Sequence, residues 1–262
     1  APGQVVGTSI QQTLDNTSAD AQIVTYTITP WTVDENGDNA CAGAPVSVDV
    51  WVEPTVTITA TGDTICDGGT TDIPVTSGNT TTNGIQYTWT VTDNPNITGE
   101  TNSVAPGQNI GTAIQQTLDN TSGDAQMVTY TITPWTLDEN GNNACPGTPV
   151  SVDVWVEPTV TITATGDTIC DGGTTDIPVT SSSTTTNGIR YTWTVTDNTN
   201  ITGETNSIAP GQVIGTSIQQ TLDNNSGDAQ MVTYTITPWT LDENGNNACP
   251  GTPVSVDVWV EP

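Results

Sequence analysis

The strongest constraint on the fold is that the sequence repeats itself with a period of 104 residues. Ala1-Pro-Gly-Gln recurs at Ala105 and at Ala209. Residues 55–158 and 159–262 differ at only eight positions, which in the first copy are 78, 79, 86, 95, 104, 109, 113 and 121. A period of this length is a whole domain, whereas solenoid repeats have periods of about 20–50 residues. We therefore expect a C-terminal half-repeat, 1–54, followed by complete repeats at 55–158 and 159–262.

The half-repeat raises a question of its own, because a domain cannot begin in its middle. Either the sequence is a window on a longer chain, or a neighbouring molecule supplies the missing strands by strand addition. We favour the longer chain, since repeats this similar are typical of extended arrays.

Alternating side chains predict the strands of each repeat. In the first complete copy, Val128, Tyr130 and Ile132 share one face of a strand. The valines at alternate positions from 150 to 156 share one face of another strand. An Asn140-Gly141 turn lies between the two runs, and this combination is a strong signal for a β-hairpin. The apolar face of that hairpin must be covered by other strands.

The remainder of the repeat supplies those strands. Shorter alternating runs begin near residues 55, 71, 84 and 110, which gives about seven strands in about 100 residues. Trp89 falls on the third strand and is predicted to lie in the core, whereas Pro74 suggests an edge strand. The predicted fold class is all-β, with tandem immunoglobulin-like antiparallel β-sandwiches of about seven strands each.

The charge balance excludes several classes of partner. The chain has 29 Asp and Glu residues, one Arg, and neither Lys nor His, so its net charge is −28. Nucleic-acid binding needs cations to replace counterions, and anionic membrane surfaces repel such a chain. No apolar run approaches the ~18 residues that span a bilayer. We expect no nucleic-acid partner and no membrane insertion.

The cysteines predict disulfides rather than catalysis or zinc binding. Zinc is disfavoured because the chain has neither a Cys-x-x-Cys motif nor a histidine, and a nucleophile would lack its usual base. Disulfides formed in an oxidising compartment are the remaining interpretation of the cysteines. The simple pairing is within repeats, Cys66 with Cys145 and Cys170 with Cys249. The alternative pairs Cys66 with Cys249 across two stacked repeats, since the first corner and the last hairpin of a sandwich can lie at opposite poles. Cys41 has no earlier counterpart within its half-repeat.

One loop in each repeat places oxygen-bearing side chains at alternate positions, as calcium loops do. The residues are Asp34, Asn36 and Asp38; Asp138, Asn140 and Asn142; and Asp242, Asn244 and Asn246. The closing bidentate glutamate of such loops is absent, and a hairpin turn that needs Asn-Gly accounts for the same pattern. We expect no resident cofactor, with calcium as the one candidate ligand.

Two tryptophans in each repeat are predicted to point outward and to form contacts. They are Trp31, Trp51, Trp135, Trp155, Trp239 and Trp259. Trp155 stands between Val154 and Val156, which face the core. Exposed aromatic residues mark protein interfaces more often than sugar sites, so neighbouring copies of the protein are the favoured partner, with surface glycans as the alternative.

Several motifs together resemble the PKD-like, immunoglobulin-like repeats of very large secreted and surface proteins of Bacteroidota-type bacteria. They are Ile65-Cys66, Tyr87-Thr-Trp89, Ala144-Cys145-Pro-Gly and the closing Val-Asp-Val-Trp-Val-Glu-Pro158. Their order covers the whole chain. The resemblance implies export, tandem arrays, and structural or adhesive work without catalysis. The sequence departs from the family in carrying Trp135 and Trp155 where Thr or Val is expected.

Two kinds of glycosylation site are candidates. The resemblance implies O-glycosylation at Thr64 and Thr168, within Asp-Thr-Ile. The Asn-x-Ser/Thr pattern occurs at Asn16, Asn79, Asn96, Asn120, Asn200 and Asn224, although a chain rich in Asn and Thr produces many such matches by chance.

The linkers favour a mechanical function. Val156-Glu-Pro158 runs directly into Thr159 with no Gly/Ser spacer, and proline stiffens the joint. We predict a non-enzymatic structural segment of an extracellular surface or filament protein, forming a stiff rod of stacked sandwiches. The alternative is a calcium-dependent or carbohydrate-binding adhesive module of a surface adhesin.

Overall fold

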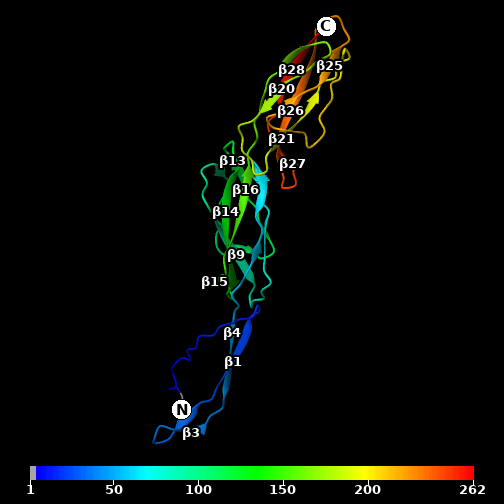
Figure 1. Cartoon of the computed structure of the whole chain (residues 1–262). Helices are drawn as coiled ribbons and strands as arrows, with labels where there is room; N and C mark the ends of the chain where they lie inside the picture. Colours follow the sequence, from blue (N-terminus) through cyan, green and yellow to red (C-terminus); the bar gives the residue numbers. More distant parts are fainter. Residues whose placement is uncertain (1–3) are drawn as a thin grey trace.

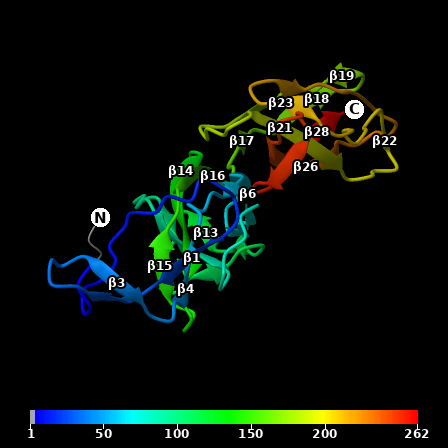
Figure 2. The same ribbon diagram turned by 90° about the horizontal axis from the view of Figure 1, so that it is seen from below.

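A computed structural model describes residues 4–262, and all of its regular elements are β-strands (Figure 1). The prediction of an all-β chain is confirmed. Two successive β-sandwiches and a smaller N-terminal β unit follow one another along an extended molecule (Figures 1 and 2). Positions 1–3 of the predicted half-repeat lie outside the described residues.

The larger sheet of the first complete repeat is organised around its longest strand, β14, whose residues alternate between buried and partly exposed. Antiparallel β9 and β16 flank it, and β6 joins the outer side of β16 in parallel. The strands are β6 (Asp63–Cys66), β9 (Ile85–Val91), β11 (Gln108–Asn109), β14 (Gln126–Leu137), β15 (Asn143–Pro146) and β16 (Val150–Glu157). The predicted hairpin is the pair of β14 and β16, in which Ile132 lies opposite Val150.

Two three-stranded sheets cover the apolar face of that sheet. One has the order β12-β8-β5 and the other β10-β13-β7. Their strands are β5 (Thr59–Ala60), β7 (Gly69–Thr70), β8 (Ile73–Thr76), β10 (Ile97–Thr98), β12 (Ala113–Ile114) and β13 (Thr117–Asn120). Pro74 was expected on an edge strand, but β8 lies between two neighbours. The proline is tolerated there because it lies just outside the two-residue pairing of β8 with β5, where its missing N–H is not needed. It is paired only with β12.

The core of the repeat lies between the two layers. The buried side chains of Val128, Tyr130 and Ile132 come from one face of β14, as the alternation predicted, and Trp89 packs with them at 8% exposure. The Tyr130 hydroxyl donates to Gln116 Oε1 at 2.7 Å. This hydrogen bond lets a large aromatic ring be buried without leaving its hydroxyl unpaired.

The second repeat has the same architecture and the same registers. Its strands are β17 (Thr163–Ala164), β18 (Asp167–Cys170), β19 (Gly173–Thr174), β20 (Ile177–Thr180), β21 (Ile189–Val195), β22 (Ile201–Thr202), β23 (Gln212–Val213), β24 (Ser217–Ile218), β25 (Thr221–Asn224), β26 (Gln230–Leu241), β27 (Asn247–Pro250) and β28 (Val254–Glu261). Its core is separate from that of the first repeat, so each repeat buries its own apolar side chains.

The half-repeat has only the strands that its sequence supplies. They are β1 (Gln22–Ile28), β2 (Trp31–Val33), β3 (Asn39–Ala42) and β4 (Val46–Val52), paired as two antiparallel ladders. No second layer covers them in the described residues. Val50, whose counterpart Val154 is fully buried, is therefore 38% exposed.

The buried tyrosines predict loss of stability at high pH. Burial, assisted by the negative charge of Glu100, raises the pKa of Tyr130 to about 12, above its ordinary value of 10.0. Because the folded state favours the neutral phenol, this contribution to stability is complete below pH 10 and is lost as the pH rises towards about 12.

A difference titration of phenolate absorbance between the protein and Tyr130→Phe should show this late ionisation. Glu100→Gln is the matched control, and it should lower the pKa of Tyr130 while leaving it above 10.0, because burial is the larger cause. Ionisation of Tyr130 at its ordinary pKa in the folded chain would contradict the packing described here.

Candidate functional site

The joint between consecutive repeats is held by polar contacts from several segments of both repeats. Strand β16 ends at Glu157, and after Pro158 the second repeat begins at Thr159. The Thr159 hydroxyl donates to Asp67 Oδ2 at 2.7 Å, which ties the start of the second repeat to the first corner of its neighbour. The linker is therefore part of the packed structure rather than a flexible spacer.

A second contact crosses the joint through the backbone. Asp124 and Thr184 form a parallel β-bridge. The amide of Ala125 donates to the Thr184 carbonyl at 2.7 Å, and the amide of Thr184 donates to Asp124 Oδ1 at 3.1 Å. The turn before β14 and a loop of the next repeat thus share hydrogen bonds that would otherwise go to water.

The third contact buries a carboxylate. Glu157 is only 1% exposed, and its Oε1 accepts hydrogen bonds from the amide and the hydroxyl of Thr186. Burying a polar group is costly unless it is hydrogen-bonded, and the two bonds from Thr186 offset this cost at Oε1, while Oε2 is buried without a partner in the described residues. Separating the repeats would break both bonds. This contact fixes the last residue of β16 against the following repeat.

The joint between the half-repeat and the first repeat has two of these contacts. The Ala21 amide donates to the Thr80 carbonyl at 2.8 Å, and Glu53 accepts from the amide of Thr82 at 3.1 Å. These residues stand one period before their counterparts at the second joint. The arrangement is therefore a property of the repeat and not of one particular pair of domains.

A disulfide joins Cys66 of the first repeat to Cys249 of the second, with 5.6 Å between their Cα atoms. This separation lies within the range of about 4.4–6.8 Å that disulfides require. Figures 1 and 2 show the end of the β26–β27 hairpin reaching the pole of the first repeat where β6 and β16 end. Cys41, Cys145 and Cys170 are exposed free thiols.

This bond confirms the alternative pairing of Cys66 with Cys249 and corrects the favoured pairing within repeats. Strand geometry gives the reason. Cys66 lies beside Glu157 at one pole, whereas Cys145 precedes Pro146, which pairs with the β14 residue Trp135 at the other. Because Gln126 marks the first pole on β14, nine strand residues separate the two cysteines, which is about 30 Å at ~3.3 Å per residue.

The loops predicted as calcium sites are hairpin turns closed by their own aspartate. Asp138 Oδ1 accepts from the amides of Asn140 and Asn142 at 2.9 and 2.8 Å, and Gly141 has a φ of +80°. Asp34 and Asp242 make the same two amide contacts in their own loops. Across residues 4–262, no cluster of three or more Cys, Asp or Glu side chains suited to a metal is present. Calcium binding at these loops stays a prediction.

The six tryptophans predicted to form contacts fall into two environments. Trp135 and Trp239 are half-buried, and their Nε1 atoms donate to Thr88 and Thr192 at 2.9 Å. Trp155 and Trp259 are 38% and 45% exposed. Trp31 and Trp51, in the half-repeat, are also exposed.

The outward tryptophans of the complete repeats have an apolar partner. Trp155 lies opposite Met127 on β14, and Trp259 lies opposite Met231 on β26. Cross-strand neighbours on one face of a sheet are in contact range, so each repeat presents a small patch of one tryptophan and one methionine. The predicted role of these tryptophans in contacts remains a prediction.

The candidate glycosylation sites differ in accessibility. Thr64 and Thr168 are exposed on β6 and β18, and modification there stays a prediction. Asn120 and Asn224 are 6% exposed, and their Nδ2 atoms donate to two backbone carbonyls each. Because N-glycosylation needs that nitrogen free, the expectation for these two is corrected. Asn16, Asn79, Asn96 and Asn200 also use Nδ2 in hydrogen bonds.

Replacement of Cys249 tests the pairing. In Cys249→Ser, we expect Cys66 to become a free thiol and not to bond to Cys145, because the two lie at opposite poles. Counting alkylated cysteines by intact mass measures this outcome, and Cys145→Ser is the matched control, which should leave the disulfide intact. Unfolding should become easier by about 2–4 kcal/mol in Cys249→Ser alone. A Cys66–Cys145 bond in that variant would contradict the structure.

The Asp138 turn predicts an acid-sensitive loop. The backbone amide of Asn142, with its side-chain amide, holds the pKa of Asp138 below its ordinary 3.8. The contribution to stability is therefore present above pH 3.8 and is lost as the pH falls through the lower folded-state pKa.

A carboxyl-carbon NMR titration measures the pKa of Asp138. Asn142→Ala removes only the side-chain donor, so it should shift the pKa part of the way towards 3.8. An unshifted Asp138 in the unmodified chain would contradict the closed turn.

Comparison with protein families identifies one sequence profile in this chain three times. The profile of the PKD-like domain matches residues 3–56, 63–160 and 167–262, which is nearly the whole sequence. Comparison with curated protein sequences gives no match. In the described residues, no helix is long and apolar enough to cross a membrane.

Similar solved structures are also chains of immunoglobulin-like or related domains. The I67–I69 fragment of titin is 15% identical, with a TM-score of 0.39, and the match covers 79% of this chain and 64% of that one. The human desmocollin-1 ectodomain is 8% identical, with a TM-score of 0.37 and coverage of 90% and 47%. Domains 4 and 5 of the S-layer protein SbsC are 13% identical, with a TM-score of 0.26 and coverage of 92% and 98%.

This chain thus spans less than two thirds of the titin fragment, and at these TM-scores we draw no argument from the three likenesses. The family is shown by the sequence profile, whose three matches follow the half-repeat and the two complete repeats of the sequence. The chain belongs to the PKD-like domain family, of which it carries three tandem members.

Proposed function

We propose that this chain is a stiff structural segment of an extracellular surface or filament protein, in which stacked sandwiches form a rod. The observation that supports the proposal most strongly is the joint. It combines a linker without spacer, hydrogen bonds from three separate parts of each domain end, and a covalent bond between repeats. A chain of independent domains would need none of these.

Stiffness follows from where the contacts lie. Asp67, Asp124 and Glu157 stand on different segments at one pole of the first repeat, and each holds a different residue of the second. A tilt that separates the repeats at any of these three places breaks a hydrogen bond there. The Cys66–Cys249 bond adds a link that cannot lengthen at all. Thermal bending at this joint is therefore expected to be small.

The charge of the chain suits such a rod. With a net charge of −28, neighbouring repeats repel one another and neighbouring chains stay apart in solution. Repulsion along the chain also favours extension over folding back. Only one cation, Arg190, is available to form a salt bridge, so the rod depends on sheet hydrogen bonds and the joint for its cohesion.

Disulfide chemistry and family both support export. Persistent disulfides form in oxidising compartments outside the cytosol, and tandem PKD-like domains are typical of extracellular structural or adhesive proteins.

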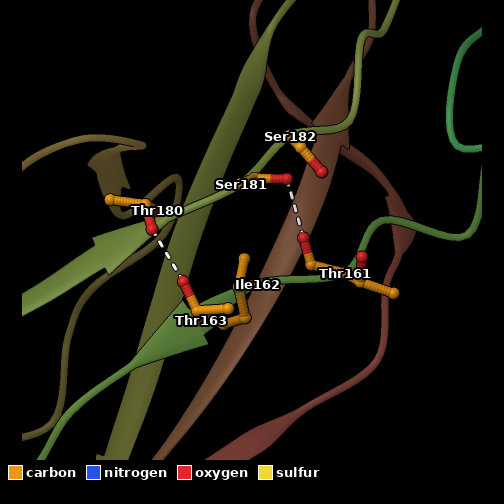
Figure 3. Close-up of a pocket in the computed structure, with 6 residues that line it drawn as sticks. All are labelled: Thr161, Ile162, Thr163, Thr180, Ser181 and Ser182. Carbon is orange, nitrogen blue, oxygen red and sulfur yellow. Dashed lines mark hydrogen bonds between the residues drawn. The ribbon is translucent and has the colours of Figure 1, made fainter.

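The pocket drawn in Figure 3 offers no catalytic group. It is a shallow site between two strand ends, lined by Thr161, Ile162, Thr163, Thr180, Ser181 and Ser182. Three of its five hydroxyls are engaged with the protein itself, since Thr163 pairs with Thr180 at 2.7 Å and Ser181 donates to the Thr161 carbonyl at 2.7 Å. A hydrolytic or transfer reaction needs a general base or an activated nucleophile, which these side chains do not supply.

An adhesive module is the second candidate, and the exposed patches of Trp155 with Met127 and of Trp259 with Met231 favour it. Aromatic rings at a solvent-facing site can cover either a partner protein or a sugar ring. Adhesion predicts that a panel of soluble oligosaccharides quenches tryptophan fluorescence, and that a variant with Trp155→Ser and Trp259→Ser loses the quenching. Absence of quenching in the unmodified chain would contradict the carbohydrate-binding form of this candidate.

Solution scattering tests the rod. We expect one extended rigid shape to account for the X-ray scattering of the unmodified chain. Five Gly/Ser residues inserted between Pro158 and Thr159, in a chain that also carries Cys249→Ser, should shorten the mean end-to-end distance, because a flexible linker then replaces the joint. The same insertion between Val104 and Ala105, in an exposed loop of the first repeat, is the matched control and should leave the overall length unchanged. Scattering of the unmodified chain that fits only a broad ensemble of bent shapes would contradict the proposal.

A further inference from the structure

Cys145 and Cys170 are unpaired thiols at the two outer poles of the complete repeats. Cys145 is the counterpart of Cys249, and Cys170 is the counterpart of Cys66, so both belong to positions that form the disulfide elsewhere in the same molecule. The function proposed above uses only the Cys66–Cys249 bond and leaves Cys145 and Cys170 without a role.

The pole that carries Cys170 reproduces the pole that carries Cys66. Strand β18 pairs in parallel with β28 and places Cys170 beside Glu261, as β6 places Cys66 beside Glu157. The following aspartate is held identically, because Asp171 Oδ1 and Asp67 Oδ1 each accept from an asparagine amide at 2.8 Å. The receiving side of the joint is thus fully formed at the end of the second repeat.

The hairpin that carries Cys145 likewise reproduces the one that carries Cys249. The Cys145 amide donates to Thr136 Oγ1 at 3.2 Å, and the Cys249 amide donates to Thr240 Oγ1 at 3.1 Å. The pairing of β15 on β14 has the same register as that of β27 on β26. Cys249 is 5% exposed in the closed joint, whereas Cys145 is exposed, which is the difference that docking would remove.

We propose that the Cys170 pole of the second repeat is a docking surface for the β26–β27-type hairpin of another repeat of this same sequence, which it holds by a disulfide from Cys170. Cys145 is the complementary half, and it bonds the Cys66-type cysteine of a preceding repeat. Each repeat is then bonded covalently to both neighbours, forward through its first cysteine and backward through its second. This inference rests on the proposed rod, whose joint it extends to a continuous series.

The bond needs an oxidant. Cys170 and its partner each lose a thiol proton, and the two electrons pass to the disulfide of an oxidised dithiol, either an oxidoreductase or glutathione, which is released in its reduced form. Pairing inside a repeat is excluded by the ~30 Å between the two cysteines of one sandwich, as strand length shows. The thiols of one repeat therefore depend on their neighbours for partners.

The test uses the full chain followed directly, after Pro262, by one further copy of residues 159–262. One variant keeps only Cys170 and the second cysteine of the added copy, with every other cysteine replaced by serine. After oxidation in glutathione buffer we expect its intact mass to fall by two hydrogens and Cys170 to resist alkylation. The matched control keeps only Cys170 and Cys249, and both of its thiols should react completely.

A reference arm separates this inference from the proposed function. The present chain, keeping only Cys66 and Cys249, should form its disulfide under the same conditions. If that bond forms while Cys170 of the extended variant is fully alkylated, the continuous series is wrong and the single joint stands. If the reference bond does not form either, the joint itself is wrong. Formation of a Cys170–Cys249 bond in the control would also overturn the inference.

Discussion

The parallel pairing of β6 with β16 is the contact on which the rest of the assembly depends. It brings the first corner of a repeat alongside its last strand, so that Cys66 and Glu157 emerge side by side at the same pole. Without that pairing, the corner would have no fixed position relative to the exit of the chain, and neither the disulfide nor the bond from Thr159 to Asp67 could form. A short strand of four residues thus connects the fold of one domain to the placement of the next.

The joint also shows how a highly charged chain can be rigid. Carboxylates that would repel one another each accept hydrogen bonds from a neutral donor. Glu157 accepts from Thr186, and Asp67 accepts from Thr159. Neutral hydroxyls and amides supply all of these donors. Charge-assisted hydrogen bonds of this kind are stronger than neutral ones and need no lysine or arginine. Because the same residues recur every period, each added repeat brings its own joint with it.

Sequence reasoning succeeded where the period of the side chains decides the outcome. The alternation at Val128, Tyr130 and Ile132 predicted the buried face of β14, because side-chain direction in a strand is fixed by its period of two. At the disulfide it left two pairings open and favoured the wrong one, while the alternative, Cys66 with Cys249, is the bond that forms. The choice depends on which pole each cysteine reaches, and that requires the three-dimensional path. The Asn120 motif misled for a related reason, since a tripeptide match carries no information about burial. Trp135 was expected to point outward, yet it is half-buried because its indole nitrogen reaches Thr88 on the neighbouring strand.

Residual dipolar couplings of the weakly aligned chain would test the central claim most directly, because they report the orientation of each repeat separately. If the joint is rigid, the couplings of 55–158 and 159–262 fit a single alignment tensor with the two repeats oriented as in Figure 1. Both repeats would then share the same magnitude of order. If the chain with its Cys66–Cys249 bond intact instead gives two alignment tensors of different magnitude, the repeats reorient independently. That result would contradict the account of a stiff, disulfide-linked rod.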